Sequence, residues 1–258
     1  MRGRTPVRHD PWVIRKVRSA TAAVRRAARS DAPLVTWFLI GLCCLVFLLS
    51  PVSGFAVTDR HGDGAVAEQL RYFRHWGVIP RDLIGGKPRA LLTLLTALFV
   101  HGSWLHLIGN MLFLYVFGGM VETRMGRVRF TLFYLCCGVL ALLAFALANP
   151  TDPQTLVGAS GAVAGLLGAF LYHFPRARIT SLFPFLFFLP LRFPAWVVLP
   201  FWLTLQWLAT RTTVEGPAVA YLAHLAGFGL GFCYTWAHYG RGTRVSGVAR
   251  ATEGESQP

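Results

Sequence analysis

Six long apolar segments, separated by connectors that carry most of the charge, constrain this chain more than any other feature. A helix of about 20 apolar residues spans the ~30 Å hydrocarbon core of a bilayer. Apolar residues make up 54% of the 258 residues and charged residues only 14%, which excludes a disordered chain and argues against a soluble enzyme. The sequence therefore predicts an all-α polytopic membrane protein, a bundle of six transmembrane helices. The expected spans are 34–55, 104–121, 130–148, 160–173, 194–210 and 217–238.

The basic connectors predict an orientation. Of the 25 Lys and Arg residues, 18 fall on the side that holds the N-terminus and 7 on the other. The positive-inside rule then places both termini in the cytoplasm of a multi-pass protein of the cell (inner) membrane. The net charge of +14 indicates lipid headgroups rather than nucleic acid as the partner, because the charges lie between apolar segments.

The chain divides into a basic N-terminal segment (1–32), a membrane domain (33–240) and a polar tail (241–258) expected to be disordered and cytoplasmic. The first segment carries 9 Lys and Arg residues, and an amphipathic helix over 12–29 is compatible with it. A mitochondrial transit peptide is the alternative. A cytoplasmic segment is favoured because the charge pattern needs no import step.

Two apolar stretches between the spans are not expected to cross the bilayer. The run 91–100 is too short to span, which is typical of an interfacial or re-entrant segment. The loop 174–193 is unusually apolar and is expected to be partly embedded in the membrane.

Four polar side chains inside the spans are candidates for function: His106 and Asn110 in the second, Ser160 in the fourth and His224 in the sixth. Polar groups in lipid cost several kcal/mol unless they find partners. At 1.5 Å per residue, Ser160 and His224 each lie roughly 10 Å below the outer surface. His106 and Asn110 are four residues apart, so they share one helix face at a similar depth.

Small residues beside Ser160 and His224 predict that their helices pack closely. Gly161-x3-Gly165 begins next to Ser160, and Ala223-x3-Gly227-x3-Gly231 begins next to His224. Close packing would bring the Ser160 hydroxyl within reach of His224, as a nucleophile and its general base require. Neither residue has an Asp or Glu near it in the spans, so the sequence predicts a Ser–His dyad rather than a triad.

The same region offers donors for an oxyanion, which acyl transfer also requires. The Ser160 N–H begins a helix, where N–H groups lack partners and the dipole is positive. The Asn110 amide and the His106 imidazole supply further donors. Each residue also has a structural interpretation: His224, or His106 with Asn110, could simply bond neighbouring helices.

A metal site is the other chemical interpretation of these histidines. His101 and His106 could bind a metal, but the sequence holds no His-Glu-x-x-His motif and the spans hold no carboxylate ligand near them. We therefore expect neither a metal nor a cofactor.

Taken in order, the motifs resemble those of the rhomboid family of intramembrane serine proteases. The resemblance covers about residues 75–238. It rests on His101-x4-His106-x3-Asn110, Phe117-Gly118, Glu122-x3-Gly126 with Phe130 and Tyr134, Gly158-Ala159-Ser160-Gly161, and Ala223-His224-x2-Gly227-x3-Gly231.

The resemblance implies a six-helix endopeptidase that cleaves transmembrane segments of other membrane proteins near the outer side of the bilayer. Ser160 matches the nucleophile, His224 the general base, and His106 and Asn110 the oxyanion hole. His101 matches a supporting position that is not catalytic. Supporting glycines are Gly158, Gly161 and Gly227.

Two departures from the family pattern accompany this match. Some members carry a Tyr four residues after the nucleophile, stacked on the catalytic His, where this chain has Ala164. A Trp-Arg pair in the first loop of some members has only a loose counterpart in Arg71–Trp76. The resemblance also implies that the fifth span, with Trp196, Phe201 and Trp202, moves to admit substrate.

Two other functions compete with proteolysis. A catalytically silent rhomboid-like protein would bind membrane segments, but such a protein would be expected to lack Ser160 or His224. A small transporter would be expected to show internal repeats, and none is found in this sequence.

Overall fold

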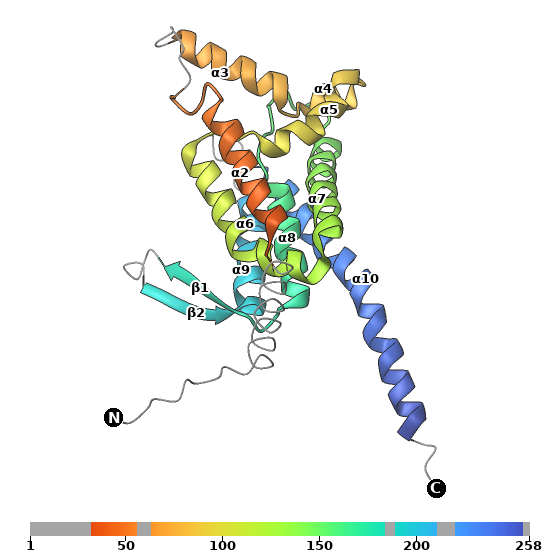
Figure 1. Cartoon of the computed structure of the whole chain (residues 1–258). Helices are drawn as coiled ribbons and strands as arrows, with labels where there is room; N and C mark the ends of the chain where they lie inside the picture. The colour runs from red at the N-terminus through yellow and green to blue at the C-terminus, as the bar shows by residue number, and fades with distance from the viewer. Residues whose placement is uncertain (1–31, 56–62, 184–188, 211–219, 255–258) are drawn as a thin grey trace, which may run out of the picture.

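The chain is mostly helical in a computed structural model, which describes residues 32–55, 63–183, 189–210 and 220–254 (Figure 1). Segment 1–32, with its expected helix over 12–29, lies almost entirely outside the described residues. The helices are α2 (Leu34–Leu48), α3 (Asp63–Trp76), α4 (Pro80–Ile84), α5 (Pro88–Thr96), the 3₁₀ helix η1 (Ala97–Phe99), α6 (Trp104–Met125), α7 (Arg127–Ala148), α8 (Ser160–His173), α9 (Ala195–Ala209) and α10 (Tyr221–Gly254).

Helix α8 lies at the centre of the bundle. Every residue from Gly161 to Phe170 is buried, whereas α6 and α7 are apolar on both faces and expose one of them. Helices α6, α7, α9 and α10 all contact α8. Its glycines and alanines allow this close approach, because small side chains let helix backbones come near one another. The first residue of this central helix is Ser160.

The helix lengths bear on the expected spans. Two helices of the described residues, α6 and α7, are long and apolar enough to cross a membrane, and four shorter helices are apolar. The first span was expected over 34–55, but α2 ends at Leu48. The short run 91–100 overlaps the apolar helical segment Pro88–Phe99 and ends one residue beyond it. At one end of the bundle, α3, α4 and α5 form a layer over the other helices (Figure 1).

Two expectations need correction. The fold is not all-α, because the apolar loop 174–193 contains an antiparallel pair, β1 (Arg178–Phe183) with β2 (Leu189–Pro194), Arg178 opposite Pro194. Pairing satisfies backbone groups that an irregular apolar loop would leave without partners. The expected disordered tail also differs: α10 continues as a helix to Gly254, and only 255–258 lie outside the described residues.

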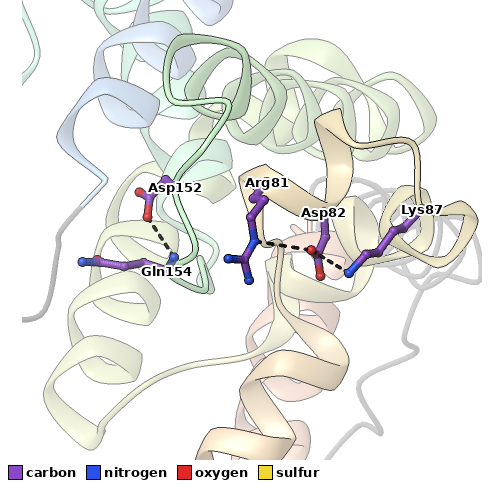
Figure 2. A network of polar contacts seen from close by, with 5 residues as sticks. All are labelled: Arg81, Asp82, Lys87, Asp152 and Gln154. Atoms are coloured by element: carbon purple, nitrogen blue, oxygen red, sulfur yellow. Dashed lines mark hydrogen bonds and ion pairs between the residues drawn. The ribbon is translucent and has the colours of Figure 1, made fainter.

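A backbone hydrogen bond attaches the loop before α8 to α4, and Figure 2 shows the polar contacts within the two segments that it joins. Asp82 pairs with Lys87 Nζ at 2.8 Å and with Arg81 Nε at 3.8 Å. The carbonyl oxygen of Asp152 accepts from the Arg81 N–H at 3.1 Å, while its side chain accepts from the Gln154 N–H at 2.8 Å. The ion pairs join residues within 81–87 and contribute under about 1 kcal/mol as exposed pairs, so it is the backbone bond that attaches the loop.

Further backbone bonds fix the last residues of this loop. Val78 and Leu156 form an antiparallel bridge, with N···O distances of 2.9 and 2.7 Å. The Gly158 N–H donates to the Ala97 carbonyl oxygen at 2.9 Å. The loop that leads to Ser160 is therefore held by main-chain hydrogen bonds to Val78 and to Ala97.

A buried carboxylate caps α2 from another helix. Glu122 of α6 is 2% exposed. Its Oε1 accepts from the Val35 N–H at 3.0 Å, and its Oε2 accepts from the N–H and the hydroxyl of Thr36, each at 2.7 Å. The first N–H groups of a helix have no partner within it, and the N-cap Pro33 supplies no side-chain acceptor. Glu122 thus ties α2 to α6.

Replacing Glu122 with alanine is expected to lower the free energy of unfolding by about 3 kcal/mol, because charge-assisted bonds contribute about 1.5–3 kcal/mol and the two Thr36 donors remain buried. Glu122→Gln should lose less, since its amide oxygen still accepts. Thermal unfolding in detergent measures both. The matched control is Glu68→Ala, at a half-buried glutamate on α3 without a hydrogen bond or ion pair in the described part of the chain. Equal melting temperatures for Glu122→Ala and this control would contradict the capping role.

Candidate active site

Helices α8 and α10 run in the same direction in close contact. A Cβ built on Gly227 would overlap the Gly161 carbonyl oxygen, and a Cβ on Gly231 would overlap that of Gly165. The two contacts advance by four residues on both helices, which defines a parallel register. Ser160 and His224 stand just before this seam, one on each helix. The register is thus the one that the small-residue pattern predicts.

His224 is 9% exposed and is surrounded by α9 and its own helix. Its Nδ1 lies 2.7 Å from Gln206 Oε1. The Trp202 ring stacks on the imidazole at a centroid distance of 6.2 Å and an angle of 28°, and Tyr221 meets it edge-on at 6.2 Å. At the position where some rhomboids carry a stacking Tyr, Ala164 is buried, and Trp202 of α9 supplies an aromatic face instead.

No hydrogen bond joins Ser160 to His224 within the described residues. Catalytic hydrogen bonds in structures without substrate are often long and tighten only in the complex. The structure therefore places the first turns of α8 and α10 side by side, with the Ser160 and His224 side chains not hydrogen-bonded to each other.

Gly158 brings the loop close to both Ser160 and His106. Its φ of +122° is a conformation that side-chain-bearing residues rarely adopt. A Cβ here would lie 2.7 Å from Cε1 and Nε2 of His106 and 3.8 Å from Ser160 Oγ. Gly158 thus leaves room for the His106 ring close to Ser160.

The hydrogen bonds of His106 indicate which nitrogen carries its proton. The Gly102 N–H donates to His106 Nδ1 at 3.4 Å. A backbone N–H can only donate, so the neutral ring has its hydrogen on Nε2, the atom next to Gly158. At the start of α6, the Ser103 hydroxyl caps the helix by accepting from the His106 N–H at 3.1 Å. His106 therefore presents a donor on the side of Ser160.

Asn110 is 7% exposed, and its amide Nδ2 donates to the His106 carbonyl oxygen at 3.0 Å. This bond uses one of the two amide hydrogens, and the second can serve another acceptor. At the start of α8, the N-cap Ala159 offers no side-chain acceptor, so the Ser160 N–H also keeps its donor capacity.

His101 is a neighbour of the donors His106, Asn110 and the Ser160 N–H rather than one of them. It is 1% exposed, its Nδ1–H donates to the Phe99 carbonyl oxygen at 3.3 Å, and its ring meets His106 edge-on at 5.3 Å. Burial, and to a lesser degree His106, lowers the pKa of His101 to about 4. His101 is thus neutral at pH 7 and supports the His106 ring. Within the described ranges, no cluster of three His, Cys, Asp or Glu residues could hold a metal.

Sequence reasoning missed Gln206. It is an amide within the apolar segment 194–210, so the rule that polar groups in a span need partners applies to it as it does to Asn110. Its spacing of four residues from Trp202 also places both on one face of a helix. These two signals could have marked Trp202 and Gln206 as candidate site residues.

The fold is a helical bundle with two helices long and apolar enough to cross a membrane, and its buried helix α8 begins at Ser160. The chain belongs to the rhomboid family: its residues 88–241, more than half of its length, match the Rhomboid domain. The family is embedded in membranes.

Three curated relatives illustrate the similarity. "Rhomboid protein 1, mitochondrial" of Saccharomyces cerevisiae is 30% identical over 171 residues, 64% of this chain and 46% of that protein. "Rhomboid-like protein 11, chloroplastic" of Arabidopsis thaliana is 48% identical over 71 residues, 28% of this chain and 25% of the relative. "Rhomboid protease GluP" of Bacillus subtilis is 32% identical over 150 residues, 56% of this chain and 25% of the relative. The chain thus spans less than half the length of each of them.

Proposed function

We propose that this protein is an intramembrane serine endopeptidase that cleaves transmembrane segments of other membrane proteins, using Ser160 and His224 as a dyad. The parallel register of α8 and α10 carries the proposal, because it brings the N-terminus of α8 beside His224. Membership in a family with members named proteases supports it.

In the proposed mechanism, His224 Nε2 takes the Ser160 proton while Oγ attacks the scissile carbonyl carbon. The oxyanion accepts hydrogen bonds from the Ser160 N–H, His106 Nε2–H and the Asn110 amide. His224 then protonates the leaving amine, the C–N bond breaks, and an acyl-enzyme remains. Water gives a proton to His224 and attacks the ester carbonyl carbon. The bond to Oγ then breaks, His224 returns the proton to Oγ, and the carboxylic acid product leaves.

The supporting residues follow from the same proposal. Gly158 gives His106 room, Gly161 and Gly227 bring α8 and α10 together, and His101 packs against His106. No metal or cofactor takes part in any step. Substrate transmembrane segments and lipids are the proposed partners.

The proposed topology has six transmembrane helices with both termini in the cytoplasm of the cell membrane. The membrane helices would be α2, α6, α7, α8, α9 and α10. The Lys and Arg distribution supports this orientation. Names of relatives refer to mitochondria and chloroplasts as well, so cysteine accessibility in cells, with probes at 1–32 and 241–258, would test the location.

Reconstitution tests the proposed activity. Purified protein in proteoliposomes with a generic single-span substrate is expected to cleave it near the outer membrane boundary, and Ser160→Ala is expected not to. Mass spectrometry of the products locates the cut. Folded wild-type protein that leaves several such substrates intact would favour the non-proteolytic binding function.

A further inference from the structure

Helix α9 presents two side chains to His224 on one face. Trp202 and Gln206 are four residues apart, which aligns them on a helix. Trp202 stacks on the imidazole ring, and Gln206 Oε1 lies 2.7 Å from Nδ1. Together they fix both the plane of the ring and its rotation about the Cβ–Cγ bond. The distance falls at the short end of the range for N–H···O bonds.

We propose that Gln206 is a positioning residue that sets the tautomer of His224, an inference that rests on the proposed protease function for its kinetic consequence. An amide carbonyl oxygen accepts but does not donate, so a bond at 2.7 Å places the imidazole hydrogen on Nδ1. Nε2 then carries the lone pair. This is the tautomer that a general base needs to accept a proton from Ser160.

Gln206 takes the place that a carboxylate occupies in a catalytic triad, but it carries no charge. It can orient the ring and select the tautomer, whereas it cannot neutralise the imidazolium that forms when Ser160 gives up its proton. Among the described residues, Tyr221 of α10 contacts the ring edge-on, and His106 of α6 is a further titratable group near it. None of these groups is a carboxylate, so Gln206 is the acceptor available to Nδ1.

The first arm of the test needs no catalysis. In protein labelled with ¹⁵N-histidine, the side-chain nitrogen shifts of His224 are assigned by their loss in His224→Ala. Wild-type protein at neutral pH is expected to show a protonated Nδ1 and an unprotonated Nε2. In Gln206→Leu, a mixture of both tautomers is expected. An unprotonated Nδ1 in wild-type protein, or unchanged shifts in Gln206→Leu, would overturn the inference whether or not the protein is a protease.

The second arm measures cleavage. Gln206→Leu is expected to lower kcat at least about tenfold with little change in KM. The substitution disturbs the orientation and tautomer of His224, on which proton transfer depends, and leaves substrate binding intact. Gln206→Glu restores an acceptor for Nδ1–H, so we expect it to recover kcat. Its negative charge also favours the imidazolium, so the acid limb of its pH–rate profile should move to higher pH.

The matched control is Thr204→Val on the same helix, where the exposed hydroxyl donates to the Pro200 carbonyl oxygen. It should keep the wild-type rate, and melting temperatures verify that every variant folds. A Gln206→Leu enzyme with wild-type kcat, or Gln206→Leu and Gln206→Glu equally impaired at every pH, would overturn the inference while leaving the protease intact. Absence of cleavage by wild-type protein would instead count against the proposed function, and the nitrogen shifts would then decide on Gln206.

Discussion

Alanine at Ser160, at His224 or at both positions is expected to leave the same residual rate, at least about 10³-fold below wild type. Residues that act as one unit in a proton-transfer step are grossly non-additive, because loss of either partner removes the whole step. Ser160 begins the buried helix α8, and His224 stands beside the seam that joins α8 to α10. Single-turnover cleavage in proteoliposomes gives the three rates.

The control for these variants is His238→Ala, an exposed histidine on α10 whose ring stacks on Tyr234 at 5.8 Å. It should cleave at the wild-type rate. A double variant far slower than either single variant would mean that Ser160 and His224 act independently, and the dyad would have to be abandoned.

Replacing Gly231 with alanine is expected to destabilise the bundle by about 3 kcal/mol or more, at the upper end of the range for overpacked cores. The new Cβ would overlap the Gly165 carbonyl oxygen and lie 2.6 Å from its carbon and 2.7 Å from its Cα. These are backbone atoms of a buried helix, so no side chain can rotate away. Helices α8 and α10 would have to separate, and cleavage should fall with them.

Gly229→Ala provides the matched control on the same helix. A Cβ at Gly229 would meet nothing within 4 Å, and alanine favours a helix by about 1 kcal/mol over glycine. Thermal unfolding in detergent should therefore show a large loss for Gly231→Ala and none for Gly229→Ala. Equal melting temperatures for the two variants would contradict the close contact between α8 and α10.

Much of the helical core could be predicted from sequence because its signals are local. Gly161 and Gly165 with Gly227 and Gly231 predict a close helix pair, and that pair is observed. The contact between Gln206 and His224 was harder to foresee, since it depends on how α9 is rotated and no spacing within one segment encodes that rotation.

Other features were missed because they depend on distant or weak patterns. The bonds from Glu122 to α2 join residues 86 and 87 positions apart. The hairpin of Arg178–Phe183 with Leu189–Pro194 arises in an apolar loop whose composition does not specify strand register. The start of α2 was predictable from its apolar residues. Its end at Leu48 was missed because apolar residues recur beyond it as far as Phe55.

The central claim is that Ser160 is an activated nucleophile, and covalent labelling tests it most directly. Folded protein in detergent is treated with a fluorophosphonate, digested, and examined by mass spectrometry for the modified residue. The account predicts an adduct on Ser160 that nearly disappears in His224→Ala, with no adduct on the exposed Ser103. An unmodified Ser160 in folded wild-type protein, or labelling that persists unchanged in His224→Ala, would contradict it.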